Sequence, residues 1–247
     1  MYALITGGTS GIGKDIAINL GKKGYDLILV SRHYGDTDQI KEQVKTNVIN
    51  LTYDLTSEEE CFKLVEESKK YDIEIFINNA GFGDIGYINK TDLRKEINMV
   101  KVNDIATLIL TKSFLLRFME NNKGKVLIVA SAAAFGVAPY MNVYYATKAF
   151  AYSLAHGYYR ELKDKKSKVS ISVLCPGPVK TRFEEVANTK FNIKSLSSQY
   201  VGKYTVKKFL KGKFIIVPGL SIKLAHTFSH LVPKRFISKI VRKQASI

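Results

Sequence analysis

The chain has 247 residues and a net charge of +16, and 46% of its residues are apolar, which is ordinary for a globular protein. No apolar run reaches the roughly 18 residues that a membrane-spanning helix needs. Two cysteines are too few for a disulfide framework, no cysteine–histidine cluster has the spacing of a metal site, and the N-terminus shows no signal peptide, so we expect a metal-free cytoplasmic protein.

The positive charge is concentrated toward the C-terminal end of the chain. All 22 acidic residues lie within residues 1–185, whereas residues 186–247 hold 13 of the 38 lysines and arginines and no acid. This asymmetry favours an anionic partner or surface for the last quarter of the chain. Because no nucleic-acid recognition motif accompanies it, we do not expect nucleic acid to be that partner.

Seven short apolar segments are expected to form strands. They are nearly continuous apolar runs, as in strands that are buried on both faces of a parallel sheet. The segments are residues 2–6, 26–31, 47–51, 73–78, 125–131, 169–174 and 213–218. Helical periodicity fills the intervals at residues 13–24, 57–71, 92–120 and 143–162. This alternation predicts an α/β fold, a single-domain doubly wound (Rossmann-like) seven-stranded parallel sheet with helices on both faces.

The first predicted strand runs into TGGTSGIG (6–13), which opens the first predicted helix. Glycines there let the backbone turn sharply and approach a pyrophosphate, while the helix N-terminus supplies N–H donors and the positive end of its dipole. The spacing is G-x-x-x-G-x-G, and a plain tight turn is the alternative to a nucleotide site. The candidate cofactor contacts in this loop are Gly7, Thr9, Ser10, Gly11, Ile12 and Gly13.

The second predicted strand ends in VSRHY, where an NAD-binding protein would place an acid for the ribose 2′-hydroxyl. Ser31 and Arg32 occupy that position here. Because an arginine suits the 2′-phosphate of NADP, we expect NADP(H) rather than NAD(H) as the cofactor. A solvated loop arginine is the alternative.

The segment YMNVYYATKAF (140–150) contains a candidate general acid/base. Tyr144 and Lys148 are four residues apart and share a helix face, whereas Tyr145 has Ala149 at the same offset. Lowering a phenol pKa from about 10 to about 7 requires about 4 kcal/mol, and an ammonium about 5 Å away at an effective dielectric of about 20 supplies roughly 3 kcal/mol. An oxidised nicotinamide ring would be a second cation. We therefore expect Tyr144 to exchange a proton with a substrate and Tyr145 to pack.

Together these motifs resemble those of the short-chain dehydrogenase/reductase (SDR) family, from residue 2 to about residue 182. The resemblance includes YDL (53–55) at the adenine, NNAG (78–81) beside the cofactor and PGPVKT (176–181) near the nicotinamide carboxamide. It implies further cofactor contacts from Asp54, Leu55, Asn79, Ala80, Gly81, Tyr144, Lys148, Pro176, Gly177, Val179 and Thr181.

The resemblance also implies the roles of four catalytic residues. Tyr144 is the general acid/base, and Lys148 lowers its pKa and binds the nicotinamide ribose. Ser131, 13 residues before Tyr144, orients the substrate oxygen, and Asn103 holds a water in a proton relay to the lysine. Because the cofactor carries the hydride in this family, the resemblance implies an oxidoreductase that acts on a carbonyl or a secondary alcohol.

The substrate is expected between two segments, residues 132–141 and a lid at residues 182–199. Their aromatic and apolar side chains predict a roomy apolar pocket for a ketone, steroid-like or acyl substrate. The alternative is that these side chains only pack the lid. The candidate pocket residues are Phe135, Tyr140, Met141 and Phe183.

Residues 220–247 have the pattern of a basic amphipathic helical extension of the domain formed by residues 1–219. Apolar stripes with basic residues beside them occur before and after Pro233, which suits the start of a second helix. An anionic membrane surface, a subunit or lid contact, and an acidic partner such as an acyl carrier protein all fit this pattern. His226 and His230 are expected to be surface histidines rather than metal ligands.

The favoured hypothesis is thus an NADP(H)-dependent oxidoreductase of an apolar carbonyl or alcohol. A catalytically silent dinucleotide-binding adaptor that acts through its basic tail is one alternative, and a reductase of the 3-oxoacyl-carrier-protein type is another. The family resemblance also implies a homodimer or homotetramer formed through the predicted helix 92–120 and the tyrosine-bearing helix.

Overall fold

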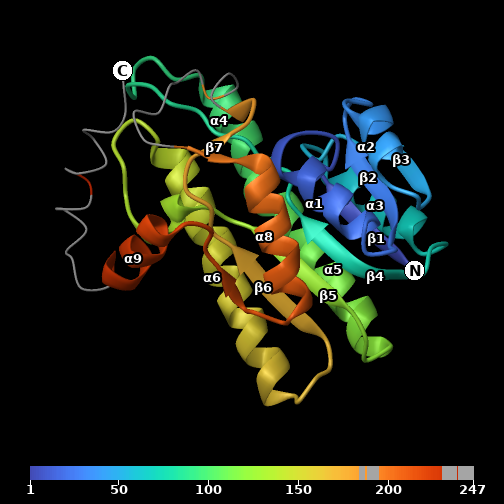
Figure 1. Ribbon diagram of the computed structural model, residues 1–247. Coiled ribbons are helices and arrows are strands. Elements are labelled where there is room, and N and C mark those ends of the chain that lie inside the picture. The colour runs from blue at the N-terminus through green and yellow to red at the C-terminus, as the bar shows by residue number, and fades with distance from the viewer. Residues whose placement is uncertain (184–186, 188–194, 230–237, 239–247) are drawn as a thin grey trace.

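The computed structural model describes residues 1–183, 187, 195–229 and 238. Seven parallel strands form one sheet in the order β3-β2-β1-β4-β5-β6-β9, which confirms the predicted α/β fold (Figure 1). The bounds are β1 Tyr2–Thr6, β2 Asp26–Ser31, β3 Val48–Thr52, β4 Ile73–Asn78, β5 Lys125–Val129, β6 Ser170–Leu174 and β9 Ile215–Ile216. A second sheet that was not predicted pairs β7 (Val179–Lys180) with β8 (Leu196–Ser197).

Helices fill the intervals between the strands and cover both faces of the sheet (Figure 1). Their bounds are α1 Gly11–Gly21, α2 Thr37–Gln43, α3 Glu58–Ser68, α4 Leu93–Val100, α5 Thr107–Glu120, α6 Asn142–Asp164, α8 Ser198–Leu210 and α9 Leu220–Ser229. Helices α2 and α8 were not predicted. The seven residues of α2 hold one apolar side chain, Ile40, so they carry no periodic signal.

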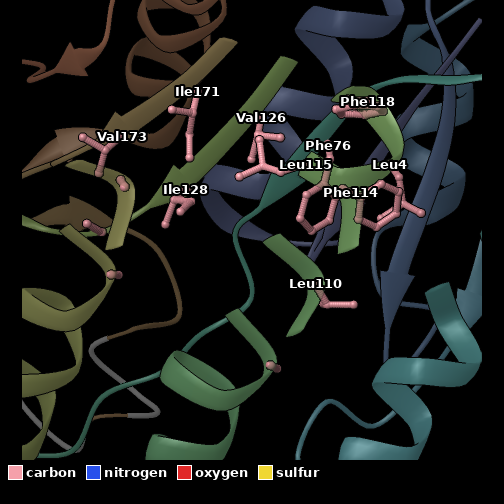
Figure 2. Close-up of a cluster of buried hydrophobic side chains, with 14 of the residues drawn as sticks. Leu4, Phe76, Leu110, Phe114, Leu115, Phe118, Val126, Ile128, Ile171 and Val173 are labelled. Atoms are coloured by element: carbon pink, nitrogen blue, oxygen red, sulfur yellow. The ribbon is translucent and has the colours of Figure 1, made fainter. Parts of the chain in front are cut away.

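Each face of the sheet has its own hydrophobic core, because alternate residues of a strand point to opposite faces. Leu4 of β1 packs among residues of α3, α5 and α6, whereas Ile5 packs among residues of α1, α2 and α8. Figure 2 shows the first core, where Phe76 stacks on Phe114 with their ring centroids 4.2 Å apart. Burial on both sides explains why the strand sequences are almost continuously apolar.

The predicted helix 92–120 is continuous but changes its winding in the middle. α4 begins after Asp92, whose carboxylate accepts a hydrogen bond from the backbone N–H of Arg94 at 2.8 Å. A π-helical stretch, Lys101–Ala106, then joins α4 to α5. Such stretches are rare and often mark functional sites, but the apolar pattern across them still looks helical, so the sequence did not reveal this one.

The strand order reverses between β1 and β4. The chain fills the sheet outward from β1 in one direction and then returns to fill it from β4 in the other. In doubly wound sheets the helices diverge at this point and leave a crevice at the carboxyl ends of the strands, where ligands bind.

Only part of the predicted C-terminal extension is described, namely α9 and Ser238. The apolar stripe after Pro233, His230 and most of the predicted lid, residues 184–186 and 188–194, lie outside the described residues. Within the described part of the chain, no helix has the length and apolar character to cross a membrane. The same residues contain no group of three or more histidine, cysteine or acidic side chains placed to hold a metal ion.

Candidate active site

The glycine-rich loop after β1 holds the backbone in conformations that a side chain would strain. Gly7 and Gly11 have φ angles of +62° and +53°, in the left-handed region. A Cβ atom added at Gly13 would lie 2.2 Å from the carbonyl oxygen of Gly7. The side-chain amide of Asn79 donates to the carbonyl oxygens of Thr6 at 2.9 Å and Gly7 at 3.1 Å. The loop is therefore a fixed backbone cradle at the N-terminus of α1.

Buried polar side chains connect β1, β4 and α5 beneath this cradle. The hydroxyl oxygen of Thr6 accepts hydrogen bonds from the backbone N–H groups of Asn79 at 2.9 Å and Ala80 at 3.0 Å. The amide of Asn78 donates to the carbonyl oxygen of Thr107 at 3.2 Å. Sequence reasoning missed Thr6 and Asn78, although both belong to the quoted motifs, because their partners lie about 30 to 70 residues away along the chain.

The loop beyond β2 presents a basic side chain to solvent. Arg32 is exposed and directly follows Ser31, the last residue of β2. The nearest acid along this loop, Asp36, is paired with Lys14, with 2.7 Å between Oδ2 and Nζ. In the neighbouring loop, the carboxylate of Asp54 accepts a hydrogen bond from the backbone of Thr56 at 3.0 Å.

The segment after β6 lies against the glycine-rich loop. A Cβ atom added at Gly11 would lie 3.2 Å from Cγ2 of Thr181, so the two segments are in close contact. The carbonyl oxygen of Pro176 accepts a hydrogen bond from the N–H of Ala132 at 2.8 Å. The fold therefore gathers the predicted cofactor segments 6–13, 78–81 and 176–181 at one end of the sheet.

Tyr144 lies in the first turns of α6 and is 9% exposed. Ser131 follows β5, and its side chain lies close enough to the Tyr144 hydroxyl to lower the pKa of that phenol. Nζ of Lys148 lies 5.8 Å from the centre of the Tyr144 ring and donates to the carbonyl oxygen of Val129 at 3.2 Å. Three of the four predicted catalytic side chains therefore meet at the carboxyl end of β5.

Burial dominates the protonation of this site. It raises the pKa of Tyr144 to about 12, and the neighbouring Ser131 side chain opposes that rise. Burial also lowers the pKa of Lys148 to about 8, against the raising effect of the Asp104 carboxylate. We predicted a Tyr144 pKa lowered by Lys148 together with an oxidised nicotinamide ring. In the chain by itself the pKa is raised instead, because burial removes the water that would stabilise the charged phenolate.

Asn103 lies on the π-helical stretch and is 2% exposed. Its amide donates to the carbonyl oxygen of Phe82 at 2.9 Å and to Oγ1 of Thr147 at 3.0 Å, while its Oδ1 accepts from the N–H of Phe82 at 3.1 Å. A Cβ atom added at Gly81 would lie 2.8 Å from Oδ1 of Asn103 and 3.2 Å from Nζ of Lys148. The fourth predicted catalytic residue thus lies beside the lysine, with Gly81 between them.

Apolar side chains surround Tyr144 in a separate cluster. Three predicted pocket residues, Tyr140, Met141 and Phe183, belong to it, and the Phe183 ring lies 5.3 Å from that of Tyr144. Sequence reasoning missed further members because they come from the loop after β4, from α4 and from small side chains near the serine: Phe82, Ile85, Met99, Ala133 and Ala138. Tyr145 packs at the edge of this cluster, as predicted.

Phe135 does not join this cluster. Its ring packs against those of Tyr152 and His226, at 5.4 Å and 4.4 Å, on the side of the main core. The pocket prediction for Phe135 is therefore corrected by the structure. The turn Ala132–Phe135 is a 3₁₀-helix, and its tighter winding places neighbouring side chains on different sides.

A protein-family model described as short chain dehydrogenase matches residues 1–191, which is more than half of the chain. The chain belongs to the short chain dehydrogenase family. It is therefore an oxidoreductase, and the match confirms the family resemblance that its motifs carry.

Curated relatives of this short-chain dehydrogenase include two groups of named enzymes. Very-long-chain 3-oxoacyl-CoA reductase of Bos taurus is 30% identical over 193 residues, which cover 75% of this chain and 61% of that protein. Estradiol 17-beta-dehydrogenase 11 of Rattus norvegicus is 30% identical over 251 aligned residues, which cover 97% of this chain and 82% of that protein. The chain thus spans 61% of the length of the bovine relative.

Solved structures show the same fold. A short-chain dehydrogenase from Sphingobium yanoikuyae in complex with NADPH has a TM-score of 0.82 at 23% identity and covers 93% of this chain and 94% of its own. One from Burkholderia phymatum in complex with NAD has a TM-score of 0.81 at 20% identity, with the same coverage of 93% and 94%. Relatives of this fold therefore bind either nicotinamide cofactor, NADPH or NAD.

Proposed function

We propose that this short-chain dehydrogenase is an NADP(H)-dependent oxidoreductase that interconverts a carbonyl and a secondary alcohol on an apolar substrate, with Tyr144 as its general acid/base. The proposal depends on one observation, the buried phenol of Tyr144 with the Lys148 ammonium 5.8 Å from its ring and the Ser131 side chain close enough to lower its pKa. Two hydroxyl groups that converge from different segments can bind one carbonyl oxygen between them and orient it for reaction.

The glycine-rich loop after β1 and the first turn of α1 suit the binding of a dinucleotide. Gly7 and Gly11 hold left-handed turns, so the backbone can approach a pyrophosphate closely. Among the described side chains, that of Ser10 makes no capping hydrogen bond to α1, and the first turn of α1 contains no acid, so its N–H groups suit a phosphate. When bound, the nicotinamide cofactor supplies or accepts the hydride.

Arg32 supports NADP(H) over NAD(H). It is exposed at the end of β2, where a 2′-phosphate would lie, and a guanidinium can make two hydrogen bonds to a phosphate. β2 ends at Ser31 and is followed by Arg32 and His33, so no acid is in place there to bind a ribose 2′-hydroxyl. Asp36 is held by Lys14 instead.

The protonation of the site favours proton donation to a carbonyl. With a pKa of about 12, Tyr144 is protonated at neutral pH and can give its proton to a carbonyl oxygen as that oxygen becomes negative. Lys148, with a pKa of about 8, is mostly charged at the same pH and stabilises the resulting phenolate. Asn103 would hold the water that returns a proton through Lys148.

The side chains around Tyr144 support an apolar substrate. Ile85, Met99, Met141 and Phe183 offer hydrocarbon surface, and the hydroxyls of Tyr144 and Ser131 are the polar groups of this site that would orient a carbonyl. The names of the relatives, a 3-oxoacyl-CoA reductase and an estradiol dehydrogenase, agree with an acyl or steroid-like carbonyl.

The Tyr144→Phe variant tests the proposal, and Tyr145→Phe is its matched control. Removal of the Tyr144 hydroxyl is expected to lower kcat by about 10²- to 10⁴-fold, the usual contribution of a general acid, while NADPH binding is kept. Tyr145→Phe should change kcat little, because that ring packs at the edge of the cluster. NADPH absorbance measures turnover of ketones, steroids and acyl thioesters, with NADH as the comparison.

Turnover near the parental level in Tyr144→Phe would remove the assignment. Binding of NADPH without turnover of any carbonyl in the parental chain would favour the catalytically silent adaptor instead.

We further propose that the protein forms homo-oligomers. The exposed side chains of Leu93, Ile97 and Val100 recur at intervals of four and three residues along one side of α4, and Phe150 of α6 is exposed as well. Exposed apolar stripes of this kind are usually covered by a partner. Membrane or acyl-carrier contacts of the basic tail stay a prediction, since Lys223 is the one basic residue of the tail that the described residues include.

A further inference from the structure

Helix α9 lies beyond residues 1–191, the part of the chain that the family model matches. It packs beside α6 and the 3₁₀ turn Ala132–Phe135, which directly follows Ser131 (Figure 1). Two of its side chains, Ile222 and His226, are half-buried. They are four residues apart and therefore project from the same face of the helix.

His226 connects α9 to both neighbouring elements. Its Nε2 lies 3.1 Å from the hydroxyl oxygen of Tyr152 on α6, within hydrogen-bond distance. Its ring lies 4.4 Å from that of Phe135, and the rings of Phe135 and Tyr152 lie 5.4 Å apart at an angle of 80°. Three aromatic rings from three elements thus form one packed group behind the segment that begins with Ser131. The prediction of a surface histidine is corrected here.

Ile222 contacts the other segment of the site. A Cβ atom added at Gly177 would lie 2.7 Å from Cγ1 of Ile222, which places the isoleucine directly on the backbone of that glycine. Gly177 follows Pro176, whose carbonyl oxygen accepts the hydrogen bond from Ala132 at 2.8 Å. Helix α9 therefore touches two segments that are hydrogen-bonded to each other, one next to the serine and one on the nicotinamide side.

We infer that α9 braces the active site from outside residues 1–191, with His226 as a positioning residue for Ser131 and Ile222 as a positioning residue for the Pro176–Gly177 segment. This inference rests on the proposed function. Ser131 lies on an irregular segment after β5, so its alignment with Tyr144 depends on what packs behind the 3₁₀ turn. Misplacement of a reacting group by about 1 Å can cost up to about 100-fold in rate.

The two residues should affect different kinetic constants. His226→Ala is expected to lower kcat for ketone reduction about tenfold and to leave the KM for NADPH within about twofold, because the serine side is loosened. Ile222→Ala is expected to raise the KM for NADPH about fivefold, because the loosened segment lies beside the nicotinamide. Rates are normalised to NADPH-binding sites counted by fluorescence titration, so partial unfolding alone does not move them.

Conservative replacements of His226 distinguish its hydrogen bond with Tyr152 from its ring contact with Phe135. His226→Gln keeps a hydrogen-bonding group near Tyr152, and His226→Phe keeps a ring against Phe135, so each is expected to recover part of the lost kcat. His226→Ala and Tyr152→Phe should be non-additive when combined, since both remove the same hydrogen bond. Thr227→Ala is the matched control, because Thr227 is exposed on the same helix and its hydroxyl, among the described residues, donates to the carbonyl oxygen of Lys223 within α9 at 3.1 Å.

The outcomes separate the inference from the proposed function. An active parental enzyme whose His226→Ala variant has the kcat and KM values of Thr227→Ala would overturn the inference alone. Equal losses in His226→Ala, His226→Gln and His226→Phe would also overturn it, because the contacts would then not matter individually. A parental chain that reduces no ketone overturns the proposed function and the inference with it.

Discussion

The proposed active site has a cofactor side and a substrate side, and different kinds of contact form the two. On the cofactor side the backbone at Gly13 packs against the carbonyl oxygen of Gly7. The side-chain amide of Asn79 donates to the carbonyl oxygens of Thr6 and Gly7. On the substrate side, side chains such as Met141 and Phe183 fill the space around Tyr144. One side is shaped by backbone contact and the other by side-chain packing.

This difference indicates which substitutions each side can tolerate. Backbone in contact with backbone leaves no room for an added atom, so the cradle has few alternatives in sequence. A cluster of apolar side chains tolerates replacements of similar volume and changes its shape with them. We therefore expect the cradle to fail abruptly on mutation and the pocket to change its preference gradually.

Gly13→Val is the strongest test of the cradle. The added carbons would meet the carbonyl oxygen of Gly7, and relief of that clash moves the loop away from its ligand-binding shape. Overpacking costs about 1–3 kcal/mol or more, so we expect NADPH affinity to fall roughly 100-fold. Fluorescence titration with NADPH measures the loss.

Gly157→Ala is the matched control for that change. Gly157 lies on α6 with no heavy atom within 4 Å of an added Cβ, and alanine in a helix is more stable than glycine by up to about 1 kcal/mol. Its cofactor affinity should match the parent. Equal affinities in Gly13→Val and Gly157→Ala would show that the cradle is less strict than its contacts indicate.

Arg32→Ala tests the part of the cofactor side that depends on a side chain rather than on the backbone. A hydrogen bond to a charged group contributes about 1.5–3 kcal/mol, so the KM for NADPH should rise about tenfold or more while the KM for NADH stays the same. Arg160→Ala, which removes an exposed arginine paired with Asp164 on α6, is the control. A parental enzyme that prefers NADH would contradict our interpretation of Arg32.

The pH profile probes Lys148, which lies between the two sides. Ketone reduction needs Tyr144 protonated and Lys148 charged, and their pKa values are about 12 and about 8, so kcat/KM should be level near neutral pH and fall as pH rises above about 8. Asp104, whose pKa burial raises to about 6, is ionised there and raises the pKa of Lys148. Asp104→Asn should therefore lower the pKa of Lys148, so that kcat/KM begins to fall at a lower pH. We expect this change to be smaller than those predicted for Gly13→Val and Arg32→Ala.

The exposed carboxylate of Asp164 offers the control for this smallest effect. Asp164→Asn breaks only the pair with Arg160 and should leave the profile unchanged. A pH profile that does not move in Asp104→Asn would show that the Asp104 carboxylate does not affect the pKa of Lys148. Burial alone would then set the lowered pKa of the lysine.

Much of this molecule could be predicted from local pattern. Nearly continuous apolar runs placed the seven strands, and the spacing of Tyr144 and Lys148 showed which of the two adjacent tyrosines shares a helix face with the lysine. These features depend on residues within one turn or one strand of each other, and helical and extended periodicity report such neighbours directly.

The remaining features depend on residues that are far apart in the chain. The contacts of Phe135 with Tyr152 and His226, and of Gly177 with Ile222, join segments that no periodicity relates. The pKa of Tyr144 was also beyond the sequence, since a helical spacing brings the ammonium near but does not show how much water the fold removes. Chain order alone settled which chemical groups are present and which are neighbours, whereas packing across the sheet decided their burial, because desolvation depends on everything that surrounds a group.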